Sequence, residues 1–189
     1  MTVEEAQRDM RIGMMGGFMG QLVSALLWLA SAAFSTWVSP RSAIAVLVLV
    51  GFFIFPITKV GLRLVGHPKV SPGNPLNGLG MQAAFVLPLC LPLVAAATLY
   101  RLEWFYPAFM IALGAHYLPF VTLYGMRMFF ALTGILVGAG VVLAVYLTMP
   151  FSTGAWFTAG ALVVFAVLGG LRVRPELNQV MPPRPLPLS

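Results

Sequence analysis

The stretch MFFALTGILVGAGVVLAVYLTMPFSTGAWFTAGALVVFAVLGGL (128–171) contains no Asp, Glu, Lys or Arg in 44 residues. An apolar helix of about 20 residues crosses the hydrocarbon core of a bilayer, so this stretch is long enough to cross it twice. The segment MPFSTG (149–154) carries the proline and glycine typical of a turn between the two crossings. The stretch therefore predicts two adjacent transmembrane helices.

Four more charge-free stretches precede it in the chain, at 12–40, 42–58, 70–100 and 104–126. Charged residues make up only 8% of the chain, against about 25% in soluble domains. We therefore predict an all-α, polytopic transmembrane helical bundle with six spans. The predicted spans are 13–37, 42–63, 78–99, 104–124, 128–148 and 155–171.

The rest of the chain is short. Residues 1–12 are predicted to form a cytoplasmic amphipathic lead-in to the membrane domain at 13–171. Residues 172–189 are predicted to be a cytoplasmic, disordered tail, since four of the last eight residues are proline.

The basic residues are distributed unequally between the two sides of this bundle. Only Arg41 and Arg101 lie on the side away from the N-terminus. The nine others lie on the N-terminal side: Arg8, Arg11, Lys59, Arg63, Lys69, Arg127, Arg172, Arg174 and Arg184. Lys and Arg accumulate in cytoplasmic loops. We therefore expect both termini in the cytoplasm and a multi-pass protein of the bacterial inner membrane, with the lipid bilayer as its first partner.

Composition also excludes several classes. The net charge of +6 comes from single residues at span ends and forms no basic stripe, so no nucleic acid is expected as a partner. The one cysteine, Cys90, allows neither a disulfide within the chain nor a Cys-based zinc site. Paired histidine motifs, a Walker loop and a Gly-x-Ser-x-Gly motif are absent. No metal, cofactor or catalytic residue is predicted.

Small residues at helical spacing predict where the helices approach one another, because lipid supplies no hydrophobic force between them. The first span carries such a small-residue face, with Gln21 beside it and Trp28 between its serines. The face predicts a packing contact, with the polar wall of a cavity as the alternative. It is formed by Gly13, Gly17, Gly20, Ser24, Ser31 and Ser35. Gly134-x-x-x-Gly138 predicts a packing contact of the fifth span. The same small residues also leave a homo-oligomer as an alternative to a monomer.

Prolines fall inside three predicted spans. Pro56 lies in the second, Pro88 and Pro92 in the third, and Pro119 in the fourth. Each proline removes a backbone donor and bends its helix. Such bends either shape the bundle or expose backbone carbonyls to a cavity.

His116, in the fourth span, is the deepest ionisable side chain apart from tyrosines and the cysteine. Such a residue is a functional candidate, although a neutral imidazole can also simply bond another helix. Tyr117 follows it. With Gln82, Asn77 and Asn74 at the start of the third span, these residues are our substrate-binding candidates.

Lys59 and Arg63 are four residues apart and share one face at the end of the second span, and Arg127 belongs to the same side. Together they are candidates for binding an anion or a lipid phosphate, which makes anionic lipid headgroups a possible partner. The alternative is ordinary positive flanking of a span.

The segments EEAQRDM (4–10), NPLNGLGMQ (74–82), LPLVAAATLYRLEWFYPAFMIALGAHYLPF (91–120) and LYGM (123–126) resemble a family of small bacterial membrane proteins with no assigned function. The resemblance covers roughly residues 4–170. It implies a membrane protein with six helices and implies no reaction.

The leading hypothesis is a membrane protein that binds or transports a small neutral or anionic molecule along a path lined by His116, Tyr117 and Gln82. One alternative is a membrane-embedded enzyme acting on a lipid or isoprenoid. Enzymatic activity is disfavoured because all five acids lie outside the predicted spans. Another alternative is a structural or regulatory subunit that acts by helix contacts.

Overall fold

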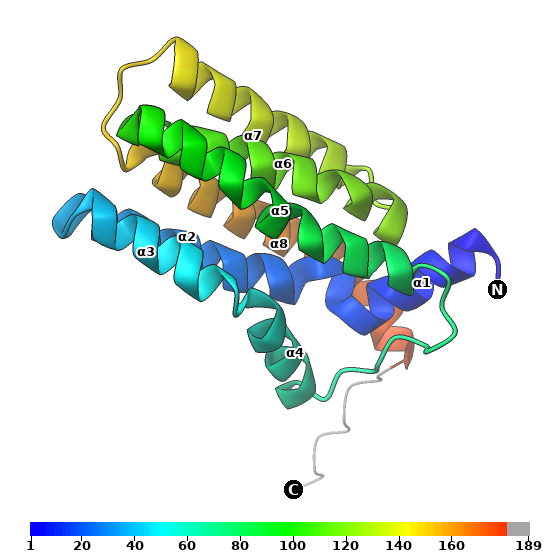
Figure 1. Cartoon of the computed structure of the whole chain (residues 1–189). Helices are drawn as coiled ribbons and strands as arrows, with labels where there is room; N and C mark the ends of the chain where they lie inside the picture. Colours follow the sequence, from blue (N-terminus) through cyan, green and yellow to red (C-terminus); the bar gives the residue numbers. More distant parts are fainter. Residues whose placement is uncertain (181–189) are drawn as a thin grey trace, which may run out of the picture.

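A computed structural model describes residues 1–180 and shows an all-α bundle with no strand in that range (Figure 1). Five of its helices or helix runs are long and apolar enough to cross a membrane. A sixth crossing exists if the bent pair α3–α4 counts as one span. The prediction of an all-α, multi-pass helical bundle is therefore confirmed.

The chain enters the bundle through a short helix. The amphipathic α1 (Val3–Met14) ends at Met15, Gly16 and Gly17, which all have positive φ. After this break α2 (Phe18–Trp37) crosses the bundle. A side chain at Gly16 would also collide with Val173, since a Cβ would lie 2.5 Å from Val173 Cγ2. Glycine is thus required there by both conformation and space.

The predicted second span is two helices, α3 (Pro40–Gly51) and α4 (Ile54–Leu64), bent by 58°. Pro56 explains where the bend falls. Its nitrogen cannot donate to the carbonyl of Phe52, and its ring crowds that carbonyl. The helix accordingly breaks at Phe52–Phe53, four residues before the proline, and restarts with the Ile57 N–H donating to the Phe53 carbonyl at 2.9 Å.

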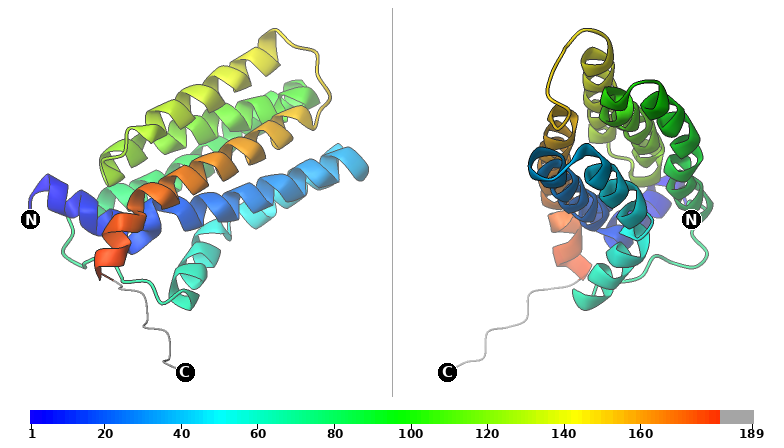
Figure 2. Two further views of the ribbon diagram at one scale, coloured as in Figure 1. Left: turned by 180° about the vertical axis from the view of Figure 1, so that it is seen from behind. Right: turned by 60° about the vertical axis from the view of Figure 1, so that its left-hand side comes forward.

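The remaining helices alternate in direction. They are α5 (Asn77–Tyr100), α6 (Phe105–Tyr124), α7 (Met128–Val145) and α8 (Thr153–Val180). The N-terminus and the C-terminal end of α8 lie at one end of the bundle (Figures 1 and 2). The opposite end, called the far end below, carries the α2–α3, α5–α6 and α7–α8 connections.

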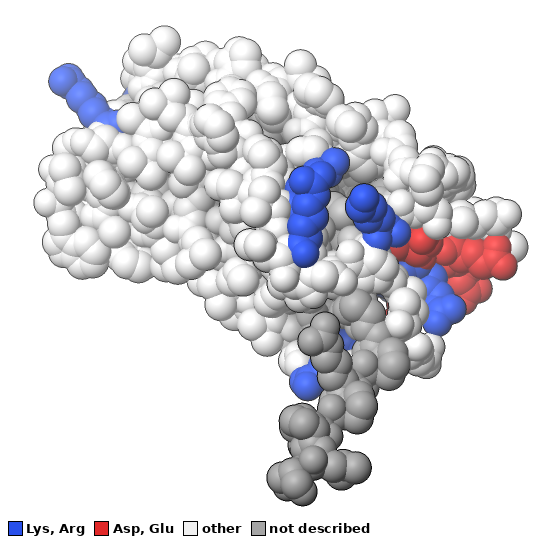
Figure 3. Space-filling model, turned by 90° about the horizontal axis from the view of Figure 1, so that it is seen from below, with Lys and Arg blue, Asp and Glu red and all other residues white. Residues whose placement is uncertain are grey.

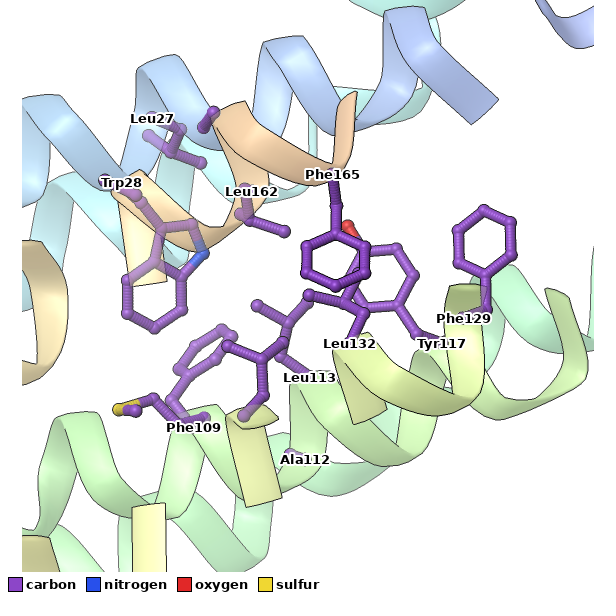
Figure 4. Packing of buried hydrophobic residues seen from close by; sticks show 14 of the residues in the cluster. Leu27, Trp28, Phe109, Ala112, Leu113, Tyr117, Phe129, Leu132, Leu162 and Phe165 are labelled. Atoms are coloured by element: carbon purple, nitrogen blue, oxygen red, sulfur yellow. The ribbon is translucent and has the colours of Figure 1, made fainter. Parts of the chain in front are cut away.

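Two helix pairs form the centre. Helix α8 lies along α2, and α6 lies along α7 (Figure 2). Buried residues on α8 repeat every three or four positions and are mostly small: Ala155, Ala159, Leu162, Ala166, Gly169 and Val173. Where the two pairs meet, Trp28 and Leu162 face Phe109 and Leu113 (Figure 4).

The α6–α7 contact depends on two glycines. A Cβ on Gly140 of α7 would lie 2.8 Å from the Pro107 carbonyl oxygen, and one on Gly114 of α6 would lie 2.7 Å from Val137. Gly134 and Gly138 meet nothing within 4 Å. The expected contact at Gly134-x-x-x-Gly138 is therefore wrong within this chain, because that face of α7 points away from α6.

Helix α8 also continues beyond the predicted span. It runs to Val180, so residues 172–180 of the predicted tail are helical. The cause is a contact with α1: the Arg11 guanidinium pairs with the Glu176 carboxylate at 2.9 Å, and Arg8 donates to Gln179 at 3.0 Å. Residues 181–189, the rest of that predicted tail, lie outside the described residues.

The two kinds of glycine in α7 allow a matched test. We expect Gly140→Ala to lower the melting temperature of the detergent-solubilised protein, because overpacking costs about 1–3 kcal/mol. Gly138→Ala has open space and replaces glycine in a helix, so it should be neutral or stabilising by up to about 1 kcal/mol. Equal melting temperatures for the two variants would contradict this account of the α6–α7 contact.

Candidate functional site

A cavity of about 680 Å³ lies between α2–α4 on one side and α5–α6 on the other. Helices α3 and α4 pack on α2, whereas α5 packs on α6. The outward side chains of both walls are apolar and exposed, as Phe53 on the α3–α4 pair and Leu89 on α5 illustrate. The cavity thus has the volume of a small-molecule site, set within the membrane-spanning part of the bundle.

The cavity is closed toward the far end. Trp28 of α2 and Phe109 of α6 line it, and their rings meet edge to face at 5.4 Å. Beyond them, Ser31 donates to the Ala43 carbonyl and lies 2.7 Å from the Tyr106 hydroxyl. This buried contact joins α2, α3 and α6, so the cavity does not open at the far end.

The lining at the other end, called the mouth below, is positively charged. Lys59 and Arg63 reach it from α4, and Lys69 reaches it from the loop before α5. The Lys59 ammonium lies over the Phe55 ring, 4.6 Å from its centroid. Within residues 1–180 no carboxylate lines the cavity or pairs with these three cations. Figure 3 shows basic groups on a surface whose middle is otherwise uncharged.

His67 adds a neutral group at the mouth. It lines the cavity, and both of its ring nitrogens are buried without a partner. Burial of the ring lowers its pKa below the ordinary value of 6.5. At neutral pH the ring is therefore uncharged and has one donor and one acceptor.

The loop that carries His67 and Lys69 is anchored to α1 through Asp9. One carboxylate oxygen accepts from the Ser71 N–H at 3.0 Å and from the Asn74 amide at 2.8 Å, and the other accepts from the Ser71 hydroxyl. Asn74 also donates to the Ala6 carbonyl. These bonds fix the loop, and with it the mouth, against the first helix.

Deeper in, His116 lies in the cavity wall. Its Nδ1 is 2.8 Å from the Ala83 carbonyl oxygen of α5. A carbonyl only accepts, so Nδ1 carries the hydrogen and Nε2 is left as an acceptor. The ring also packs against Tyr117 and Phe120. The bond to Ala83 gives His116 a structural role beside any role in binding.

The structure brings five of the predicted site residues to this cavity: His116, Tyr117, Asn77, Lys59 and Arg63. It places three others elsewhere. Gln82 is exposed on the outside of α5. Successive residues of a helix point about 100° apart, so a residue can lie next to the cavity in sequence and still face away from it. Asn74 is buried in the loop anchor, and Arg127 is exposed at the start of α7.

Sequence reasoning missed several lining residues. Thr58 precedes Lys59 and is buried against Gly20 of α2, and its hydroxyl donates within its own helix. The pattern of residues gave no signal for it. Ser24 lies on the small-residue face of α2 and Gln21 lies beside it, where the sequence favoured a packing face over the polar wall of a cavity. The structure gives that face both roles.

A protein-family comparison matches residues 3–171 to "Family of unknown function (DUF7010)". The match includes every residue that lines the cavity. No curated protein and no solved structure matches the chain.

The loop anchor gives a pH-dependent prediction. Burial raises the pKa of Asp9, but its bonds from Asn74 and Ser71 outweigh this and hold it below the ordinary 3.8. The anchor's stabilisation is therefore complete above that value and lost as pH falls through the lowered one. We expect Asp9→Ala to destabilise the protein by about 1 kcal/mol at pH 7, discounted for partial exposure.

Thermal melting of the two proteins from pH 7 to pH 3 checks this: their difference should shrink as the pH falls. Glu4→Ala, an exposed change on the same helix, is the control and should melt like the parent protein. An Asp9→Ala protein with unchanged melting at pH 7 would refute the anchor.

Proposed function

We propose a function from the cavity itself, because the chain belongs to the DUF7010 family, whose function is unknown. The protein binds, and in a transport cycle would carry, a small amphiphile with an anionic group. The observation that supports this most directly is the pairing of an apolar chamber with a mouth whose charged groups are all cations.

The charge balance at the mouth favours an anion. Lys59, Arg63 and Lys69 have no acidic counterpart among the cavity-lining residues, so their field attracts negative charge. Ammonium and guanidinium groups are strong donors to phosphate and carboxylate oxygens. A bare cation would be repelled there, and a wholly apolar ligand would leave these donors unused.

The chamber favours an apolar body on the same ligand. Most side chains between the mouth and the Trp28–Phe109 contact are aliphatic or aromatic, including Leu87, Leu91 and Leu113. Burying apolar surface is worth about 25 cal/mol per Å². The exposed apolar residues on both walls fit entry from the surrounding lipid.

The other hypotheses have less support. A hydrolase or transferase needs a second polar group positioned beside His116, and no carboxylate lines the cavity within residues 1–180. A subunit acting only by helix contacts would leave the small-residue face of α2 free. Within this chain Gly20 lies against Thr58 of α4, and Ser31 bonds Ala43 of α3 and Tyr106 of α6.

We also propose that both chain ends face the cytoplasm of a bacterial inner membrane, because eight of the ten basic residues within 1–180 lie on the side that carries the N-terminus. The cationic mouth would then lie on the side of the cytoplasmic leaflet and would receive its ligand from that leaflet.

Alkyl phosphate binding tests the function. In phosphatidylcholine nanodiscs we expect dodecyl phosphate to bind more tightly than dodecanol, with an affinity that falls as salt is added. Replacing two charges by Lys59→Gln with Arg63→Gln should weaken binding by about tenfold or more, since charge-assisted bonds are worth about 1.5–3 kcal/mol. Titration calorimetry measures both.

The matched control is Arg41→Gln with Arg101→Gln, which removes two charges at the far end. It should leave the affinity unchanged. If dodecanol binds as tightly as dodecyl phosphate, or if both double variants bind alike, the cationic mouth is not an anion site.

Sidedness is tested by labelling single cysteines in a Cys90→Ser background. In bacterial spheroplasts, a membrane-impermeant maleimide should label Glu103→Cys at the far end. It should label Glu4→Cys only after lysis. The reverse pattern would place the mouth on the outer side.

A further inference from the structure

An amide without partners lies in the cavity wall, away from the charged mouth. Gln21 of α2 is 2% exposed, and neither its amide nitrogen nor its amide oxygen makes a hydrogen bond within residues 1–180. It also lines the cavity. Buried polar side chains are nearly always bonded, and hydrocarbon offers no substitute partner. Gln21 therefore has an unused donor and an unused acceptor in the cavity wall. Both atoms are covered and the oxygen lies toward Gly169 of α8, so a ligand reaches them by a rotation of the side chain toward the cavity.

Two hydroxyl groups lie beside this amide. Ser24 follows Gln21 by three residues on the same helix, and the Tyr117 hydroxyl from α6 lies close to both. All three residues line the cavity, and neither atom of the Gln21 amide has a hydrogen-bond partner within residues 1–180. We call these three residues the amide subsite. Hydroxyl groups can donate or accept by rotation, so the subsite can adapt to a ligand that bears both functions.

The surroundings of the amide subsite are uncharged. Leu27, Trp28, Phe109 and Leu113 continue the cavity wall past it, whereas the three cations belong to α4 and the loop. A charged group placed among these residues would be desolvated without a counter-charge. The chemistry that fits is a neutral group with one donor and one acceptor, such as an amide. Because a trans amide in a chain directs its N–H and its C=O to opposite sides, one of them bonds Gln21 and the other is left for Ser24 or Tyr117.

We propose that the ligand carries, within its apolar portion, a neutral amide that hydrogen-bonds to Gln21, with Ser24 and Tyr117 as further partners. This rests on the proposed function, since the same ligand's anionic group occupies the mouth. The amide subsite then selects among anionic amphiphiles: those with an amide in reach satisfy Gln21, and plain alkyl phosphates leave it unbonded.

Synthetic alkyl phosphates test this directly. The probes are dodecyl phosphate and a series of equally long alkyl phosphates, each with one amide at a different position along the chain. We expect one member to bind the native protein in phosphatidylcholine nanodiscs about tenfold more tightly than dodecyl phosphate, since a site built to bond a polar group discriminates strongly against its absence.

Gln21→Met keeps the length of the side chain and removes both amide atoms. In this variant the amide-bearing phosphate should lose its advantage, to within about twofold of dodecyl phosphate, while dodecyl phosphate itself binds at least as well as before. Tyr117→Phe is a second variant, expected to reduce the advantage in part. Gln82→Met, which changes an exposed glutamine outside the cavity, should preserve it in full.

The outcomes separate the two proposals. If dodecyl phosphate binds the native protein but no amide-bearing member exceeds it, the amide subsite is overturned and the anion site stands. An advantage that survives both Gln21→Met and Tyr117→Phe also overturns the subsite. If no alkyl phosphate binds the native protein, the proposed function itself fails.

Discussion

Hydrocarbon supplies no hydrogen-bond partners, so each polar atom within the bundle has to find one in the protein or in a bound molecule. The backbone meets this demand by being helical almost throughout residues 1–180. Where the backbone departs from a helix inside the bundle, at Phe52–Phe53, a proline has already removed the donor that would continue it. Side chains obey the same constraint: Ser31 bonds the Ala43 carbonyl, and His116 bonds that of Ala83. Within the helices of residues 1–180 the Gln21 amide departs from this rule, as His67 does in the loop after α4, and the amide carries the most specific inference about a ligand.

The limits of the sequence follow from what each pattern encodes. Charge-free apolar runs indicate membrane-crossing helices, and they predicted the all-α bundle. They say nothing about which face of a helix meets which neighbour. The glycine motif at Gly134 and Gly138 was therefore placed on the wrong face, two residues from the contact that Gly140 makes. Likewise, Gln82 is polar and close to the cavity in sequence, but it points outward.

Contacts between distant parts of the chain were beyond the reach of the sequence. The prolines after Arg174 suggested a tail, but a partner 165 residues upstream extends α8 to Val180. The candidate site, too, could be predicted from the sequence only in part. Residue type and position in a span selected His116, Tyr117 and the α4 cations. Only the packing of α2 against α6 shows that Gln21 faces the same cavity as they do.

The pairing of Arg11 with Glu176 has a consequence for how the protein is made. The same guanidinium also donates to the Tyr124 carbonyl at 2.8 Å, so it joins α1 to the end of α6 and to α8. A ribosome delivers Arg11 first and Glu176 more than 160 residues later. During synthesis α1 can first dock on the loop at Ser71 and Asn74 and on the end of α6, whereas Arg11 gains its carboxylate only when the last helix has emerged. Completion of this ion pair is thus the last of the α1 contacts to form, and chains released early would leave the Arg11 guanidinium without its carboxylate.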